Sequence, residues 1–118
     1  MRFCTLEKCV LFVVFGLYLI FTAVAQADPI RDGAAAYKRG DYETALRLLR
    51  PLAEQGDAAG QFLLGRMYFN GHGVQKDYFE AARWHRRSAD QGDVRAISAL
   101  GSMYENSQGV RQDYTEAA

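Results

Sequence analysis

The two histidines are the residues of this chain best suited to metal or acid–base chemistry. His72 stands in a glycine-rich segment, and His85 stands in a segment with helical periodicity. Neither has a second His, a Cys or a carboxylate at a ligand spacing such as His-x-x-x-His, which places two ligands on one helix face. We therefore predict ordinary surface histidines and no bound metal.

Motifs for a catalytic nucleophile are absent from the sequence. Lys38 and Lys76 are the only lysines after residue 27, and neither follows a serine by three positions, so Ser-x-x-Lys does not occur. There is also no Gly-x-Ser-x-Gly and no phosphate-binding glycine loop; Gly71-His72-Gly73 is typical of a compact turn. We predict no catalytic residue and no cofactor, and a hydrolase is the least favoured of three functional hypotheses.

A five-residue sequence motif recurs along the chain at intervals of thirty-six residues. Its three copies are Asp41-Tyr42-x-x-Ala45, Asp77-Tyr78-x-x-Ala81 and Asp113-Tyr114-x-x-Ala117. Residues 41–74 and 77–110 are identical at 16 of 34 positions. A fixed period of about 20–50 residues indicates a solenoid, in which each unit buries its apolar face against its neighbours. Function should then lie in a surface built by repetition.

Each unit is predicted to be a pair of helices. In the complete unit, residues 57–92, the helices should run from about 57 to 69 and from about 77 to 91, the second beginning with a capping box of Asp77 and Glu80. A shorter unit, 28–56, precedes it. Pro51 should kink the second helix of that unit near Arg50, or else split it in two.

An incomplete unit, residues 93–118, follows the complete one. Its first helix would lack its own partner and would leave Leu100, Met103 and Tyr104 partly uncovered. Solenoids need terminal units with a polar outer face. We therefore expect that the sequence is a fragment of a longer protein, or else that a partner completes it.

The first 27 residues have the pattern of a secretory signal peptide. Arg2 and Lys8 precede an uncharged apolar run from 9 to 25, and small residues follow at the cleavage region. We predict cleavage after Ala27, with Ala25 as the other site, and hence a periplasmic or secreted protein. An uncleaved anchor is the alternative, because 17 apolar residues reach the lower limit of the roughly 17–25 needed to span a bilayer.

The remaining 91 residues suffice for one small domain without disulfides, because both cysteines lie in the predicted signal. The whole chain balances 14 basic against 14 acidic residues, and removal of Arg2, Lys8 and Glu7 leaves 12 against 13. A nearly neutral domain has no overall field to attract nucleic acid or an anionic membrane.

The repeated residues resemble a known family. The stretch 56–68, with Gly73-Val74 and then 77–84, is similar to the Sel1-like repeat, a longer relative of the tetratricopeptide repeat. The similarity covers nearly all of 30–118, and a plain tetratricopeptide repeat, with its period of about 34 residues, fits less well. The resemblance implies an all-α, right-handed α-solenoid of antiparallel helix pairs that holds other proteins. The cysteine pairs of one secreted subfamily are absent.

Two surfaces are candidates for recognition. In this family the first helices of the units line the concave side, and their unpacked face would present Phe62, Arg66, Phe69, Asn70, Ser98, Ser102 and Glu105. Phe62 and Phe69 would be exposed interface aromatics, or would instead contact the next repeat. The second helices would align a basic ladder, which would be either a solvated outer face or a docking site for an acidic partner or polysaccharide: Arg47, Arg50, Arg83, Arg86 and Arg87.

The preferred hypothesis is therefore an exported, non-catalytic scaffold that binds an unidentified protein. The second hypothesis is a module that binds cell-wall or other polysaccharide through concave aromatics and the basic ladder.

Overall fold

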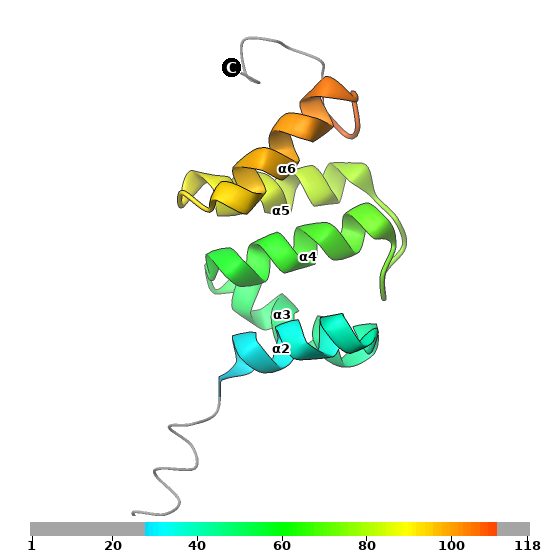
Figure 1. The fold of residues 1–118 in the computed structure, drawn as a ribbon, viewed down its shortest axis with the longest axis vertical. Coiled ribbons are helices and arrows are strands. Elements are labelled where there is room, and N and C mark those ends of the chain that lie inside the picture. The colour runs from blue at the N-terminus through cyan, green and yellow to red at the C-terminus, as the bar shows by residue number, and fades with distance from the viewer. Residues whose placement is uncertain (1–27, 111–118) are drawn as a thin grey trace, which may run out of the picture.

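The computed structural model describes residues 28–110. That part of the chain contains five helices and no strand, and successive helices turn back on one another to form a stack (Figure 1). The helices are α2 (Pro29–Arg39), α3 (Tyr42–Glu54), α4 (Ala58–Asn70), α5 (Tyr78–Asp90) and α6 (Val94–Glu105). Each packs against the next along the chain, and α2 also touches α4. The prediction of an all-α solenoid of helix pairs is confirmed.

An aspartate carboxylate caps the start of every one of these helices. Asp57, for example, accepts a hydrogen bond from the backbone N–H of Gly60 at 2.7 Å, and Asp77 accepts from Phe79 and Glu80 at 2.9 and 3.1 Å. These bonds satisfy N–H groups that have no partner within the helix. The boundaries expected from local sequence signals therefore lie within a residue or two of those observed.

Only one of the two hydrogen bonds of the predicted capping box forms at the start of α5. The carboxylate of Asp77 does cap the helix, but Glu80 does not bond back to the backbone N–H of Asp77. That N–H instead donates to the carbonyl of Tyr68 at 2.9 Å, and Glu80 pairs with Arg83 at 2.5 Å. The loop before α5 thus returns to α4 for its hydrogen bond, which a purely local motif does not anticipate.

Pro51 lies inside α3, and α3 is one continuous helix. The alternative in which proline splits this segment into two helices is therefore wrong. Pro51 lies in the last turn, where Gln55 still donates to its carbonyl at 3.0 Å. A proline there removes a single hydrogen bond, which the surrounding packing can tolerate.

The core is built from small residues and a few larger ones. One cluster centres on Ala36, Leu49, Leu64 and Met67, all fully buried, and a second on Ala81 and Met103. Alanine and glycine at the contacts allow neighbouring helices to approach closely. A further contact joins units: the ideal Cβ of Gly73 would lie 3.0 Å from Tyr42 Cβ, and Gly109 likewise abuts the backbone of Tyr78. This repetition explains why Asp-Tyr and Gly-Val recur together.

Tyr42 and Tyr78 therefore occupy like positions in successive units, as a single stack requires. The third copy, Tyr114, and the predicted signal peptide with its cleavage sites lie outside the described residues. No helix within 28–110 is long and apolar enough to cross a membrane.

Candidate functional site

A cleft of about 380 Å³ opens between α4 and α6. We call it the α4–α6 cleft. Its lining comes from α4, from α6 and from one residue of α5, the helix that packs against both. The lining residues are Phe62, Arg66, Phe69, Asn70, His85, Arg95, Ser98, Ala99, Ser102 and Met103.

Most of the residues predicted for the concave face meet in this cleft. Phe62, Arg66, Phe69, Asn70, Ser98 and Ser102 all line it, whereas Glu105 does not. Sequence reasoning missed the remaining lining residues: His85, Arg95, Ala99 and Met103. Whether any of these side chains contacts a partner stays a prediction.

Phe62 is not the exposed aromatic expected of an interface anchor. Its side chain is buried, with 8% of the residue accessible. The guanidinium of Arg95, on the next unit, lies 4.5 Å from the centre of the Phe62 ring, and the ring of His85 lies 5.6 Å away. Of the two interpretations of Phe62 given above, the structure therefore shows the contact with the next repeat. Phe69 is half-buried, 5.0 Å from the ring of Tyr78.

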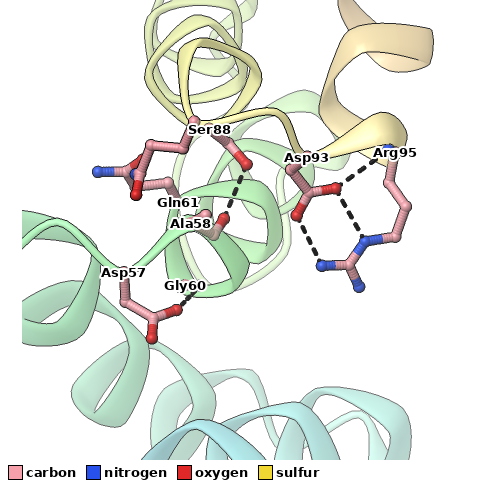
Figure 2. Close-up of polar contacts among 8 residues, drawn as sticks. Asp57, Ala58, Gly60, Gln61, Ser88, Asp93 and Arg95 are labelled. Carbon is pink, nitrogen blue, oxygen red and sulfur yellow. Dashed lines mark hydrogen bonds and ion pairs between the residues drawn. The ribbon is translucent and has the colours of Figure 1, made fainter.

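The two arginines of the cleft differ in their partners: Arg95 is paired with a carboxylate and Arg66 lies over aromatic rings. Arg95 donates to both carboxylate oxygens of Asp93, at 3.1 and 2.8 Å (Figure 2). These bonds hold the pKa of Asp93 below its usual value. Arg66 lies over the rings of Tyr37 and Phe62, at 5.4 and 5.9 Å, and no carboxylate of residues 28–110 forms an ion pair with it.

His85 is a core residue, and the prediction of a surface histidine is wrong. Only 2% of the residue is accessible, and its ring packs directly on Gly65 of α4. The Nδ1 atom is buried and has no hydrogen-bond partner in the described part of the chain. Burial and, to a smaller extent, the nearby charge of Arg66 together lower the pKa of His85 to about 4. The imidazole is therefore neutral at pH 7.

The repeat itself carried a signal for this burial. His85 stands thirty-six residues after Leu49, a fully buried side chain that packs on Gly33 in the first unit. The second unit places an imidazole where the first places a leucine. The alignment at thirty-six residues already pairs His85 with Leu49, and the apolar character of Leu49 would have assigned His85 to the core.

His72 is likewise held within the protein. Its ring stacks on Tyr42, with centroids 4.2 Å apart and planes 6° from parallel, and its Nδ1 lies 3.2 Å from the hydroxyl of Tyr37. It is half-buried between two units, so the expectation of a surface residue is only partly met. Within residues 28–110, no three His, Cys, Asp or Glu side chains gather as metal ligands would.

The arginines of the predicted basic ladder are all exposed, and most have partners on the protein. Arg50 donates to the hydroxyl of Tyr68 at 3.1 Å, and Arg86 makes the same bond to Tyr104 one unit later. The other ladder residues are Arg83, paired with Glu80; Arg87, 5.0 Å over the ring of Trp84; and Arg47. The repeated Arg–Tyr bond links neighbouring helices, which gives two of these arginines a structural role.

Polar contacts also join α4 to both of its neighbours in the chain. The hydroxyl of Ser88 on α5 donates to the carbonyl of Ala58 at 2.8 Å (Figure 2). Gln61, buried on α4, donates to the carbonyl of Ala53 and accepts from Gln91 at 2.9 Å. These bonds hold α4, which forms one wall of the cleft, in place between α3 and α5.

Comparison with known proteins gives a consistent result. The family model of the Sel1 repeat matches residues 31–57, 58–93 and 94–118. A Sel1 repeat protein from Oxalobacter formigenes is similar in structure, with a TM-score of 0.72 and 35% identity over 78% of this chain and 37% of that one. A protective antigen of uropathogenic Escherichia coli strains, described as displaying an SLR fold, has a TM-score of 0.72 and 34% identity over 80% of this chain and 21% of that one.

No curated protein matches the chain. The chain spans well under half the length of both similar structures.

Proposed function

Because the chain belongs to the Sel1 repeat family, we propose that it is a non-catalytic scaffold that binds a partner protein in the α4–α6 cleft, in the periplasm or outside the cell. Sel1 repeats form scaffolds that typically mediate protein interactions. The observation that carries the proposal for this chain is the cleft itself, which gathers six of the seven side chains expected on the concave face.

The composition of the cleft suits a protein ligand. Phe69 and Ala99, both half-buried, supply apolar surface, while Arg66, Ser98 and Ser102 present charge and hydroxyl groups. Sites that combine an apolar base with a few directed polar groups are typical of peptide and ligand recognition. The non-catalytic role rests on the sequence, which holds no motif for a nucleophile.

The location outside the cytoplasm is supported by residues 1–27. A basic start, an uncharged apolar run and small residues near Ala25 and Ala27 are the pattern of an exported precursor. Fractionation of cells that express the full chain, with mass spectrometry of the product, tests this part. An extracytoplasmic product that begins at residue 26 or 28 supports it, and an uncut cytoplasmic chain contradicts it.

The binding site can be tested by site-specific photo-cross-linking in the native host. A benzoylphenylalanine replaces Ser98, which lines the cleft, or in the matched control Glu43, an exposed residue of α3 outside it. We expect a discrete cross-linked protein from position 98 that position 43 does not give. Equal products from both positions, or none from position 98 with a folded chain, would count against the cleft as the binding site.

The same cells distinguish the polysaccharide hypothesis. If the chain is retained by purified cell wall, Ser102→Trp abolishes that retention, and position 98 gives no cross-linked protein, the cleft binds glycan instead. The structure gives this alternative little support, because Phe62 is buried and Arg50 and Arg86 already bond to tyrosine hydroxyls.

A further inference from the structure

The α4–α6 cleft carries positive charge and no negative charge on its lining. Arg66 and Arg95 contribute the cationic groups, and no Asp or Glu is among the residues that line it. The domain as a whole is nearly neutral, so this is a local asymmetry. Complementarity of charge favours an anionic group of the partner at this position.

Arg66 is the arginine whose charge is available to a ligand. Arg95 already makes two hydrogen bonds to the carboxylate of Asp93. Arg66 has no such counter-ion within residues 28–110, and the rings of Tyr37 and Phe62 hold its guanidinium in place. A guanidinium oriented by aromatic rings is prepared for paired hydrogen bonds to a carboxylate.

His85 contributes a second polar side chain to the lining of the cleft. The imidazole lines the cleft and is buried, and its Cγ, Nδ1 and Cε1 atoms face Gly65. Nδ1 has no hydrogen-bond partner among residues 28–110, and buried N–H groups without a partner are rarer in proteins than buried acceptors without one. We therefore place the proton on Nε2, at the edge of the ring away from Gly65. Nε2–H is then a donor that an anionic ligand can satisfy.

The polar side chains of the cleft repeat at intervals of one turn along each of the two helices. Ser98 and Ser102 lie one turn apart on α6, and Arg66 and Asn70 lie one turn apart on α4. One turn of four residues is about 6 Å. Alternate residues of an extended chain are spaced by about 6.5 Å. The spacing of polar side chains along each helix therefore matches that of an extended peptide segment, one side chain of which would point into the cleft.

From these observations we propose that the α4–α6 cleft holds an acidic side chain of an extended partner segment, with Arg66 pairing its carboxylate and His85 donating a further hydrogen bond. This rests on the proposed function, since it assumes that a protein segment enters the cleft. It adds the chemistry of the residue that the cleft selects.

A peptide array tests the selectivity with defined probes. Nine-residue peptides of varied flanking sequence, blocked at both ends, carry either Glu or Gln at the centre; a third set carries Gln and a free terminal carboxylate. The folded chain is compared with Arg66→Gln, with Arg95→Gln and with Arg31→Gln, a control that removes an exposed charge from α2 outside the cleft. Circular dichroism checks that each variant is folded.

We expect the best Glu-centred peptides to bind at least about tenfold more tightly than their Gln-centred pairs, or about 1.4 kcal/mol. Arg66→Gln should remove that preference, Arg95→Gln should weaken it less, and Arg31→Gln should leave it unchanged. His85→Leu should reduce it without abolishing binding.

Equal binding of Glu- and Gln-centred peptides, with binding still lost in Ser98→Trp, would overturn this inference and leave the proposed function standing. A preference for the free terminus would overturn the choice of a side-chain carboxylate. Absence of peptide binding, together with cross-links from Ser98 that do not differ from those at Glu43, would overturn both proposals.

Discussion

The imidazole of His85 rests directly on the Cα of Gly65. A Cβ at Gly65 would lie 2.7 Å from both Cε1 and Nδ1 of His85, closer than carbon atoms approach in proteins. The same relationship holds between Leu49 and Gly33 in the first unit, where the distance to Leu49 Cδ2 would be 2.6 Å. The glycine therefore sets how closely the two helices of a unit can pack.

Gly65→Ala should destabilise the fold, because the added methyl group overlaps the buried ring of His85, which would have to shift from its packed position. Overpacking of this kind costs about 1–3 kcal/mol, which exceeds the gain of up to about 1 kcal/mol from replacing glycine inside a helix. Urea unfolding followed by circular dichroism measures the change.

Gly101→Ala is the matched control for that substitution. Gly101 holds the same repeat position, and apart from the nearby backbone of its own helix and its chain neighbours, no atom of the described residues lies within 4 Å of its ideal Cβ. This variant should gain up to about 1 kcal/mol from helix propensity alone. A loss of stability at Gly101 equal to that at Gly65 would show that the effect does not come from His85.

His85→Leu should stabilise the protein by about 1–3 kcal/mol. The substitution removes a buried Nδ1 that has no hydrogen-bond partner, and leucine already fills the same position against glycine in the first unit. Thermal and urea unfolding at pH 7 measure the gain. A destabilised His85→Leu would mean that the imidazole makes a favourable interaction which its buried surroundings do not reveal.

Stability should fall as the pH is lowered from about 6.5 to about 4. His85 takes up its proton near 6.5 in the unfolded chain, whereas burial lowers its pKa to about 4 in the fold. Between these values the unfolded state binds more protons, so acid favours unfolding, by up to about 3 kcal/mol at the lower end. Arg66 adds to the lowering and Asp93 opposes it.

The free energy of unfolding, measured in urea at several pH values from 7.5 to 4, checks this dependence. Carboxylates titrate at the acidic end in any variant, so His85→Leu is the reference, and the difference between the two curves isolates His85. Parallel curves for the two proteins would contradict the assignment of a buried, neutral imidazole.

Tyr68→Phe should cost about 1 kcal/mol, because it removes the hydroxyl that accepts from Arg50 at 3.1 Å. Arg50→Met, which keeps an unbranched side chain, should cost a similar amount. In the double variant the two losses should not add, since both remove the same bond. Additive losses in this cycle would show that the repeated Arg–Tyr contact contributes nothing to stability.

Much of the helical architecture could be predicted from local patterns. The helix starts follow from aspartates whose carboxylates cap N–H groups two or three residues ahead, and these bonds depend only on neighbouring residues. The period of the repeat then implied that units stack. Even so, the reciprocal half of the capping box at Glu80 was wrong, because the loop before α5 bonds to Tyr68 of the preceding helix.

The sequence by itself determined the repeat and the pairs of helices, because the period and the helix caps can be read from the order of residues alone. The expectation that Arg66 and Ser98 lie on a concave side came from the family resemblance and stays a prediction. Only the tertiary structure decided that Phe62 and His85 are buried and that the guanidinium of Arg66 on α4 lies over the ring of Tyr37 from α2. Burial and pairing depend on which side chains arrive from other helices. An imidazole on a helix face has the same local sequence whether water or Gly65 lies beside it, and only the packing of α5 against α4 distinguishes the two.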